Sequence, residues 1–523
     1  MSFSDSEFGA IRSFLWPIHR HEVKKIVPMM LMLFLICFNY SILRNVKDAV
    51  VVTAKSSGAE VIPFIKVWVL LPMAILVTFI FTRLTNRYSQ EKIFYFTISS
   101  FLLFFGFFTF ILYPYRDVFH PHQLADSLEL VAPAGFKGLI AMFRNWSFTI
   151  FYVICELWGS MVLSVLFWGF ANEVTKITEA RRFYSMLGVI ASSAGVVAGF
   201  SANYMTTDSW EMTLRILILT IIGSGCLTMF IFYWMNRRVL NDPSFDELHL
   251  SKKEMLAGKK KLSMRESFSY LSNSKYLICI AVLVVCYNLV INLIEIVWKD
   301  QLSQLYPSPI EYNRYMNYVT SAVGIIATLT SLFMSHLISR FGWTRTALIT
   351  PVSMLLTSIG FFAFMLFRHD LAGPVFALTG TTPLAIAVFF GAAQVCISKA
   401  CKYSVFDSTK EMTFIPLGHE CKLKGKAAID GVGSRLGKSG GSVIHQGLLM
   451  IFGSISMSAP YVAAILTLVI AGWMVAVRSL GRKFSAIIGE KGREDVGEPS
   501  QIETADRLEK GSENSLNALK ASI

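Results

Sequence analysis

Long apolar segments recur along the whole of this chain, and they limit the folds open to it more than any other feature. Hydrophobic residues make up 54% of its 523 positions and charged residues 16%, with a mean hydropathy of +0.53. A helix that crosses a bilayer needs about 20 predominantly apolar residues. Scanning with that length predicts twelve crossing helices, at residues 26–48, 61–83, 92–114, 147–172, 183–205, 212–236, 276–298, 313–338, 343–367, 382–406, 427–450 and 457–478.

These segments predict an all-α polytopic membrane protein with its helices in two groups of six. Backbone groups in lipid have no outside hydrogen-bond partner, which leaves helices and closed barrels, and the sequence lacks the alternation of barrel strands. A hydrophilic stretch separates the sixth segment from the seventh. The predicted division is an N-terminal segment, a first half, a linker, a second half and a polar tail, at 1–25, 26–236, 237–275, 276–481 and 482–523.

Basic residues indicate the orientation of these helices. The net charge is +13, but Lys and Arg gather in alternate loops, among them the 84–91 turn, the 237–275 linker and the 407–426 connection. The positive-inside rule then predicts that both termini are cytoplasmic. The same distribution argues against a nucleic-acid partner. The eight cysteines include no CxxC pair and indicate neither a metal site nor a disulfide framework.

Four ionisable residues interrupt the apolar segments: Lys66, Glu156, Glu295 and Lys438. A charge at membrane depth costs about 2.5 kcal/mol or more unless it faces water, a partner or a ligand. Two cations and two anions, divided between the halves, therefore predict a polar chamber for a charged solute. For Lys66, near the start of its helix, the alternative is snorkelling to the interface. For Glu295, nearer its helix end, the alternative is a position on the rim.

Other polar residues on the same helices extend the predicted chamber. Arg435 and Lys438 are three positions apart and project from one face of a glycine-rich helix, which suits contact with phosphate. Asn288, Asn292 and Glu295 fall at positions i, i+4 and i+7 and form one polar stripe, expected to face the interior. Asn288 is a neutral member of this stripe that lies close to Glu295.

Weak internal similarity connects the two halves. Lys47-Asp48, at the end of the first helix, corresponds to Lys299-Asp300 at the end of the seventh, three residues out of step. Six plus six helices with parallel repeats is the layout of the major facilitator superfamily, whose substrates bind between the halves near the midplane. Arg44, Lys47 and Asp48 end the first helix, where a gate or an interface is expected.

Several longer runs resemble the ATP/ADP translocases of plastids and obligate intracellular bacteria, of the chlamydial and rickettsial type. The most specific begins with Phe406-Asp-Ser-Thr-Lys-Glu-Met-Thr-Phe-Ile-Pro-Leu417, and the others are 43–55, 59–68, 424–430 and 437–441. The resemblance covers nearly all of residues 25–480. That family imports ATP in exchange for ADP, with phosphate accompanying the ADP in many members. Its functional charges map here onto Lys66, Glu156, Glu295 and Lys438.

The resemblance implies a secondary transporter rather than an enzyme, in the inner membrane of an intracellular bacterium and acting as a monomer. It implies ATP, ADP, inorganic phosphate and the lipid bilayer as partners, and no cofactor. Lys66, Lys438 and Arg435 would hold the nucleotide phosphates. Glu156 and Glu295 would pair with those lysines in the empty chamber and release them as substrate arrives.

Three alternatives remain open at this point. A proton-driven importer of several nucleotides would use Glu156 or Glu295 as a protonatable group. A membrane-bound nucleotide-hydrolysing enzyme is suggested by the sequence Gly437-Lys-Ser, but Val432 occupies the place of the first glycine of a Walker A loop. A receptor built on a carrier fold would bind nucleotide without moving it.

Overall fold

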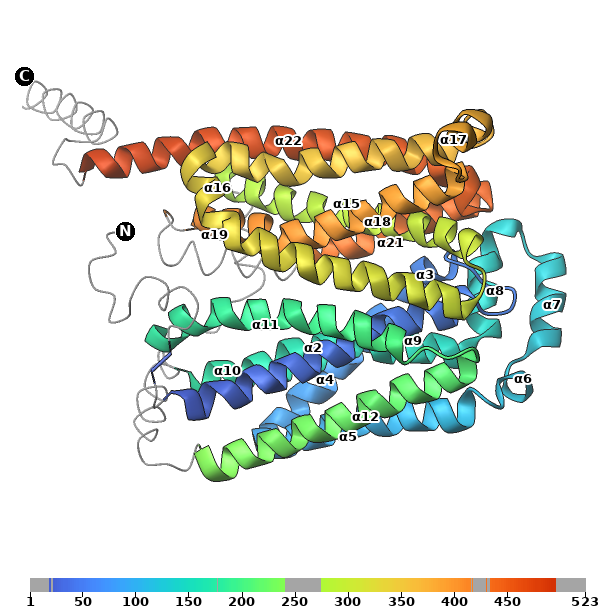
Figure 1. Ribbon diagram of the computed structural model, residues 1–523, viewed down its shortest axis with the longest axis horizontal. Helices are drawn as coiled ribbons and strands as arrows, with labels where there is room; N and C mark the ends of the chain where they lie inside the picture. The colour runs from blue at the N-terminus through green and yellow to red at the C-terminus, as the bar shows by residue number, and fades with distance from the viewer. Residues whose placement is uncertain are drawn as a thin grey trace, which may run out of the picture.

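The computed structural model of the protein is an elongated bundle of helices that run along its longest axis (Figure 1). It describes residues 18–19, 22–175, 177–239, 274–414, 416, 429 and 433–494, and the regular structure in these ranges is helical. The N-terminal half, blue to green, and the C-terminal half, yellow-green to red, lie side by side. The predicted all-α fold class is confirmed.

The first half consists of long helices, several of which contain a π-helical stretch (η). Their bounds are α2, Val23–Val52; α3, Val61–Phe64, with η1, Ile65–Leu70, and α4, Leu71–Arg87; α5, Gln90–Phe107, with η2, Phe108–Leu112; α9, Trp146–Trp158, with η4, Gly159–Phe167, and α10, Trp168–Val174; α11, Ile177–Tyr204; and α12, Trp210–Trp234, with η5, Met235–Val239.

The second half repeats this plan with longer uninterrupted helices. Their bounds are α15, Lys275–Leu305; α16, Pro309–Leu366; α18, Pro383–Cys401, with η7, Lys402–Phe406, and α19, Asp407–Phe414; α21, Ser434–Phe452; and α22, Ile455–Glu494. Within α16, Gly342 has a φ of 74° and is not helical, and it marks the turn predicted between the eighth and ninth crossing helices.

Short helices close one end of the bundle. They are α6, Arg116–Phe119; α7, His122–Val131; η3, Ala134–Phe136; α8, Lys137–Arg144; and α17, Ala372–Thr379. We call this end, on the right in Figure 1, the cap end. The opposite end, where α2 begins and α22 ends, is called the termini end.

Ten of the described helical stretches are long and apolar enough to cross a bilayer, and each overlaps one of the twelve predicted segments. Two predicted segments do not meet this measure within the described residues. Segment 313–338 forms the first part of α16, and the described part of segment 427–450 is α21. The helix α21 is less apolar than the other crossing helices because it contains Arg435, Lys438 and several glycines.

The predicted chain divisions fall largely outside the described residues. This applies to most of the N-terminal segment 1–25, to residues 240–273 of the 237–275 linker, and to the tail from residue 495 onward. The last helix is longer than the predicted boundary at 481 allows, because α22 continues to Glu494. The two six-helix halves remain a prediction as separate units.

The halves meet near the cap end through small and polar side chains. Asn45 of α2 donates from Nδ2 to Asn317 Oδ1 at 2.8 Å and to Thr320 Oγ1 at 2.9 Å, both on α16. Asn317 Nδ2 in turn donates to Asn203 Oδ1 of α11 at 3.0 Å. We call these four residues the asparagine clasp. A Cβ on Gly199 of α11 would overlap the Asn317 carbonyl oxygen, so the close approach of α11 and α16 requires glycine there.

Candidate functional site: a charged chamber between the two halves

A continuous series of ion pairs lies between the halves at membrane depth. Lys47 Nζ lies 3.1 Å from Glu156 Oε1 and 2.8 Å from Asp48 Oδ1, and Lys299 Nζ lies 2.9 Å from Asp48 Oδ2. Glu295 Oε1 then lies 3.5 Å from Lys299 Nζ and 3.6 Å from Lys399 Nζ. We call these residues the charge ladder: Glu156, Lys47, Asp48, Lys299, Glu295 and Lys399.

The ladder joins helices of both halves. Lys47 and Asp48 come from α2 and Glu156 from α9, whereas the remaining members come from α15 and α18. The crossing point is the Asp48–Lys299 pair, whose residues are 0% and 3% exposed. Removing one partner of such a buried pair leaves an uncompensated charge and costs about 3–5 kcal/mol. The ladder therefore ties the two halves together at its centre.

Lys66 lies beside the ladder without joining it. It belongs to the π-helical stretch η1, and such stretches often mark functional positions in helices. Among the described residues, no carboxylate comes within 4.0 Å of its ammonium, although Glu295 and Glu156 interact with it electrostatically at longer range. Lys66 is half-buried rather than fully exposed at the membrane surface. Its cation is therefore available to an incoming anion.

Lys438 lies on α21 in the opposite half and is exposed. Its charge interacts at longer range with Glu156 of the first half and Glu295 of the second, the same two glutamates that act on Lys66. No carboxylate of the described residues lies within 4.0 Å of its ammonium. Arg435, one turn earlier, is also exposed and adds to the positive potential around Lys438.

The predicted pairing of the two glutamates with Lys66 and Lys438 is wrong for this structure. Glu156 pairs with Lys47, and Glu295 pairs with Lys299 and Lys399. The physical reason for one of these pairs is local, because Glu295 and Lys299 are one turn apart on α15 and share a face. The four residues predicted from membrane depth do meet in one chamber, but their closest partners differ.

The asparagine stripe of α15 packs against α21. Asn288 Nδ2 donates to the Val284 carbonyl oxygen of its own helix at 2.8 Å, and Asn292 Nδ2 donates to the Lys438 carbonyl oxygen at 3.0 Å. Both residues are buried and lie against glycines of α21, Asn288 against Gly437 and Asn292 against Gly441. The stripe thus faces the interior, as predicted, and fixes the position of the helix that carries Lys438.

Lys299 and Lys399 were not among the residues predicted for the site, and Lys47 and Asp48 were predicted only as gate or interface residues. For three of them a signal was present, because the repeated pairs Lys47-Asp48 and Lys299-Asp300 occupy corresponding helix ends. In the structure the two repeated lysines both pair with Asp48. Lys399 gave no such signal, since it lies among other lysines near the end of its helix.

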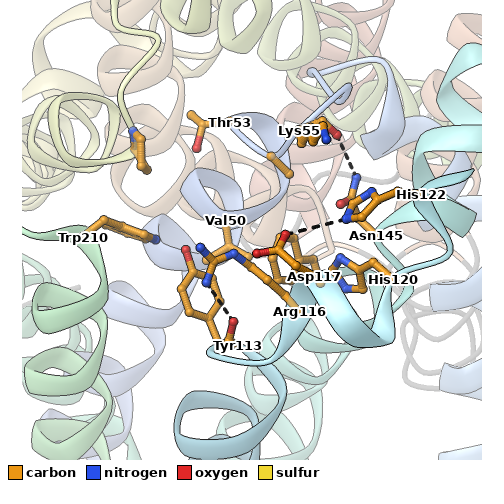
Figure 2. Close-up of a pocket in the computed structure, with 13 residues that line it drawn as sticks. Val50, Thr53, Lys55, Tyr113, Arg116, Asp117, His120, His122, Asn145 and Trp210 are labelled. Carbon is orange, nitrogen blue, oxygen red and sulfur yellow. Dashed lines mark hydrogen bonds and ion pairs between the residues drawn. The ribbon is translucent and has the colours of Figure 1, made fainter. Parts of the chain in front are cut away.

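A separate cavity of about 200 Å³ lies at the cap end (Figure 2). Arg116 Nη1 donates to the Tyr113 carbonyl oxygen at 2.9 Å, and Asn145 Nδ2 donates to the Lys55 carbonyl oxygen at 3.3 Å. The exposed Asp117 adds a negative charge beside Arg116. No ladder residue lines this cavity, so the chamber rather than the cavity is the candidate anion site.

The burial of His120, on the wall of this cavity, predicts that the stability of the folded protein depends on pH. Burial lowers the pKa of His120 to about 4, with a smaller effect of His122. Its ordinary pKa is about 6.5, so the unfolded chain takes up a proton at higher pH than the folded protein does. The stabilising effect of the neutral ring is present above pH about 6.5 and is lost as the pH falls towards 4, by up to about 1.4 kcal/mol per pH unit. Apparent melting temperatures at pH 7 and pH 5 should differ less in His120→Gln than in the parent, and an unchanged difference contradicts this.

Comparison with known proteins gives the chain a family. The profile of the family described as TLC ATP/ADP transporter matches residues 1–484. The chain is 47% identical to ADP,ATP carrier protein 1 of Chlamydia muridarum, over 94% of each chain. It is 41% identical to the chloroplastic ADP,ATP carrier protein 2 of Arabidopsis thaliana, over 93% of this chain and 79% of the plant protein.

Solved structures agree on the fold. A crystal structure of a D-xylose-proton symporter matches with a TM-score of 0.54 at 11% identity, over 88% of this chain and 97% of the other. A bacterial homologue of the iron transporter ferroportin, in an inward-facing state, matches with a TM-score of 0.52 at 12% identity, over 88% and 98%. These confirm the predicted fold of a major-facilitator-like transporter. Because the family profile matches most of its length and the chain is 47% identical to one of these carriers, the chain belongs to the TLC ATP/ADP transporter family.

Proposed function

We propose that this membrane protein exchanges ATP for ADP, the pair of substrates that its carrier relatives are named for. One observation carries the proposal: Lys66 and Lys438, from opposite halves, both interact electrostatically with Glu156 and Glu295, and neither has a carboxylate within 4.0 Å of its ammonium among the described residues. Substrate between them would touch both halves at once. Such contact lets a ligand favour one arrangement of the halves over another, which alternating access requires.

The charges around these lysines explain why an anion of several charges fits. The ladder holds three cations and three anions, so its own charge is balanced. Lys66, Lys438 and Arg435 add positive charge that the ladder does not neutralise. Phosphate oxygens accept charge-assisted hydrogen bonds from both ammonium and guanidinium groups. A nucleotide di- or triphosphate would therefore find its counter-charge here.

The direct test is exchange by purified protein in liposomes. Vesicles preloaded with ADP should take up labelled ATP, and vesicles with nothing inside should take up little. Added phosphate separates simple exchange from exchange with phosphate. Uptake of label that depends on internal ADP supports a carrier over a receptor. Absence of uptake into ADP-loaded vesicles contradicts the proposal.

Phosphate moving with ADP would balance the exchange, because ATP carries about one negative charge more than ADP. We assign Asn288 a role in this step, since its amide can hydrogen-bond a phosphate oxygen without adding charge. Its Nδ2 is bonded to Val284 in the structure and would have to exchange that partner. Asn288→Ala should lower phosphate co-transport several-fold more than ADP transport. Equal losses of labelled phosphate and labelled ADP place Asn288 in the common site or the fold.

The second candidate function is a proton-driven nucleotide importer. The ion pairs of Glu156 with Lys47 and of Glu295 with Lys299 and Lys399 favour exchange instead, since a carboxylate that keeps cationic partners has less tendency to take up a proton. Exchange should therefore change by less than about twofold when an inward proton gradient is imposed on ADP-loaded vesicles. Strong acceleration by the gradient favours the proton-driven importer.

The remaining assignments complete the proposal. The protein lies in the bacterial inner membrane as a monomer, with both termini and the 237–275 linker on the cytoplasmic side, and its halves 26–236 and 276–481 rock about the chamber. It moves nucleotide without hydrolysing it. Release of phosphate from ATP by the purified protein would contradict transport without hydrolysis. Reaction of the linker with a membrane-impermeant reagent added outside intact cells would contradict its place on the cytoplasmic side.

A further inference from the structure

One turn of α2 is attached to the second half in two different ways. Asp48 reaches Lys299 by the ion pair of 2.9 Å, inside the chamber. Asn45, three residues earlier, donates to Asn317 and Thr320 in the asparagine clasp. Residues three apart share a helix face, and α2 is helical through Val52. The two attachments therefore belong to one rigid piece of helix and separate from the second half together.

Asp48 differs from the other ladder carboxylates in having cations on both halves. Its Oδ1 pairs with Lys47 of its own helix and its Oδ2 with Lys299 across the interface. A buried charge is costly when it loses its last partner. Asp48 can release Lys299 and still keep Lys47, and Lys299 can still keep Glu295, whose Oε1 lies 3.5 Å from its ammonium. The structure thus allows the cross-half pair to open without stranding the carboxylate.

A bound polyphosphate can draw Lys299 away from Asp48. Lys299 lies 3.5 Å from Glu295, the carboxylate that also acts on Lys66, so phosphates drawn to Lys66 approach Lys299 as well. Several phosphate charges compete for an ammonium more strongly than one carboxylate does. The hydrogen bonds within the clasp, in contrast, join neutral groups and are each worth only about 0.5–1.5 kcal/mol net. Arg44 Nη2 of α2 adds one charged donor to Thr320 Oγ1 at 3.3 Å, worth about 1.5–3 kcal/mol. Loss of the ion pair is therefore the larger of the two changes.

We propose that Asp48 is a positioning residue through which nucleotide in the chamber opens the asparagine clasp: phosphate captures Lys299, Asp48 stays with Lys47, and the end of α2 separates from α16. This rests on the proposed function. It goes further by assigning a gate to the clasp and a ligand-dependent release to Asp48. Asp48 itself need not touch the substrate.

A cysteine at Ser321 can report the state of the clasp. Ser321 is 2% exposed on α16, and its Oγ donates to the Val196 carbonyl oxygen of α11 at 3.1 Å, so it is shielded while the halves meet. Ser321→Cys changes little in size. Its rate of reaction with a maleimide, in detergent-solubilised full-length protein, measures clasp opening without requiring transport. The same protein without Ser321→Cys gives the background from the native cysteines.

Two variants should open the clasp while affecting ADP binding in opposite directions. Asp48→Asn and Lys299→Gln should each raise the rate of maleimide labelling at least about fivefold, because each removes the cross-half pair from a two-state equilibrium. Equilibrium binding of labelled ADP should become at least about threefold tighter in Asp48→Asn, which frees a cation, and weaker in Lys299→Gln, which removes one. The double variant should label no faster than either single one.

Asp300→Asn is the matched control. Asp300 occupies the position in the second half that corresponds to Asp48, but among the described residues its carboxylate accepts hydrogen bonds from Gln301 and Gln304 and makes no cross-half ion pair. Its variant should label and bind ADP like the parent. Labelling of Asp48→Asn at the parent rate overturns the proposal, as does faster labelling together with loss of ADP binding, which indicates a damaged fold. Failure of the parent to exchange ATP for ADP in liposomes counts against the proposed function alone.

Discussion

Replacing Lys66 or Lys438 with glutamine is expected to lower ATP/ADP exchange at least about 30-fold while the protein still inserts and folds. Nucleotide bound against these lysines would exclude water from their ammonium groups. Truncating one partner of such a buried charge contact costs about 2–5 kcal/mol, and each 1.4 kcal/mol corresponds to about tenfold. Neither lysine has an ion-pair partner within 4.0 Å among the described residues. The loss should therefore fall on substrate and not on an internal salt bridge. Initial rates of labelled ATP uptake into ADP-loaded vesicles measure it.

Lys92→Gln is the matched control for these two variants. Lys92 is an exposed lysine in the first turn of α5, away from the charge ladder. It should exchange nucleotide at the parent rate. Near-normal exchange by Lys66→Gln or by Lys438→Gln would show that the replaced lysine does not bind substrate and that its ammonium only extends to the membrane surface.

Gly437→Ala should destabilise the protein and reduce exchange, since no room exists for a methyl group between α15 and α21. A Cβ at Gly437 would lie 2.7 Å from Asn288 Cβ and 2.7 Å from the Val285 carbonyl oxygen. Backbone cannot move aside as a flexible side chain can, and overpacking of this kind costs about 1–3 kcal/mol. The neighbouring residue is Lys438, so the same displacement should shift a substrate contact. A lower apparent melting temperature and slower exchange are the expected measurements.

Gly440→Ala tests the same change on the same helix without the clash. A Cβ at Gly440 would meet nothing within 4 Å. Alanine also has a higher helix propensity than glycine, by about 1 kcal/mol in water. This variant should be as stable as the parent or slightly more so. If Gly440→Ala and Gly437→Ala lose stability equally, the destabilisation reflects the loss of glycine in general and not the contact with Asn288.

The fold could be predicted largely from hydrophobicity, because crossing a bilayer demands long apolar helices whatever their neighbours are. Two segments show where this fails. Segment 427–450 was predicted and its described part is the helix α21, but Arg435 and Lys438 leave α21 less apolar than the other crossing helices, although it packs closely against α15. The π-helical stretch at Lys66 could not be predicted either, since a change from i→i+4 to i→i+5 backbone hydrogen bonds leaves the overall apolarity of the segment unaltered.

The sequence could predict which residues belong to the candidate site but not which of them form ion pairs with each other. Membrane depth alone identified Lys66, Glu156, Glu295 and Lys438, and both lysines interact electrostatically with both glutamates in the structure. Which carboxylate lies nearest to which ammonium depends on the packing of α2 between the halves, and that is a tertiary property. Asp48 illustrates this, because its position near a helix end suggested an interface but not contact with lysines of both halves.

The balanced charges of the ladder determine what the transmembrane voltage can act on. The three ammonium groups and three carboxylates cancel over the ladder as a whole, so the ladder adds almost no net charge to the chamber. Each uncompensated elementary charge, however, exchanges about 2.3 kcal/mol with a potential of 100 mV. The field therefore acts on Lys66, Lys438, Arg435 and the cargo that they hold. Over a complete cycle the protein's own charges return to their starting positions, so the steady electrical current during turnover would report the ionisation of the nucleotide and of any accompanying phosphate.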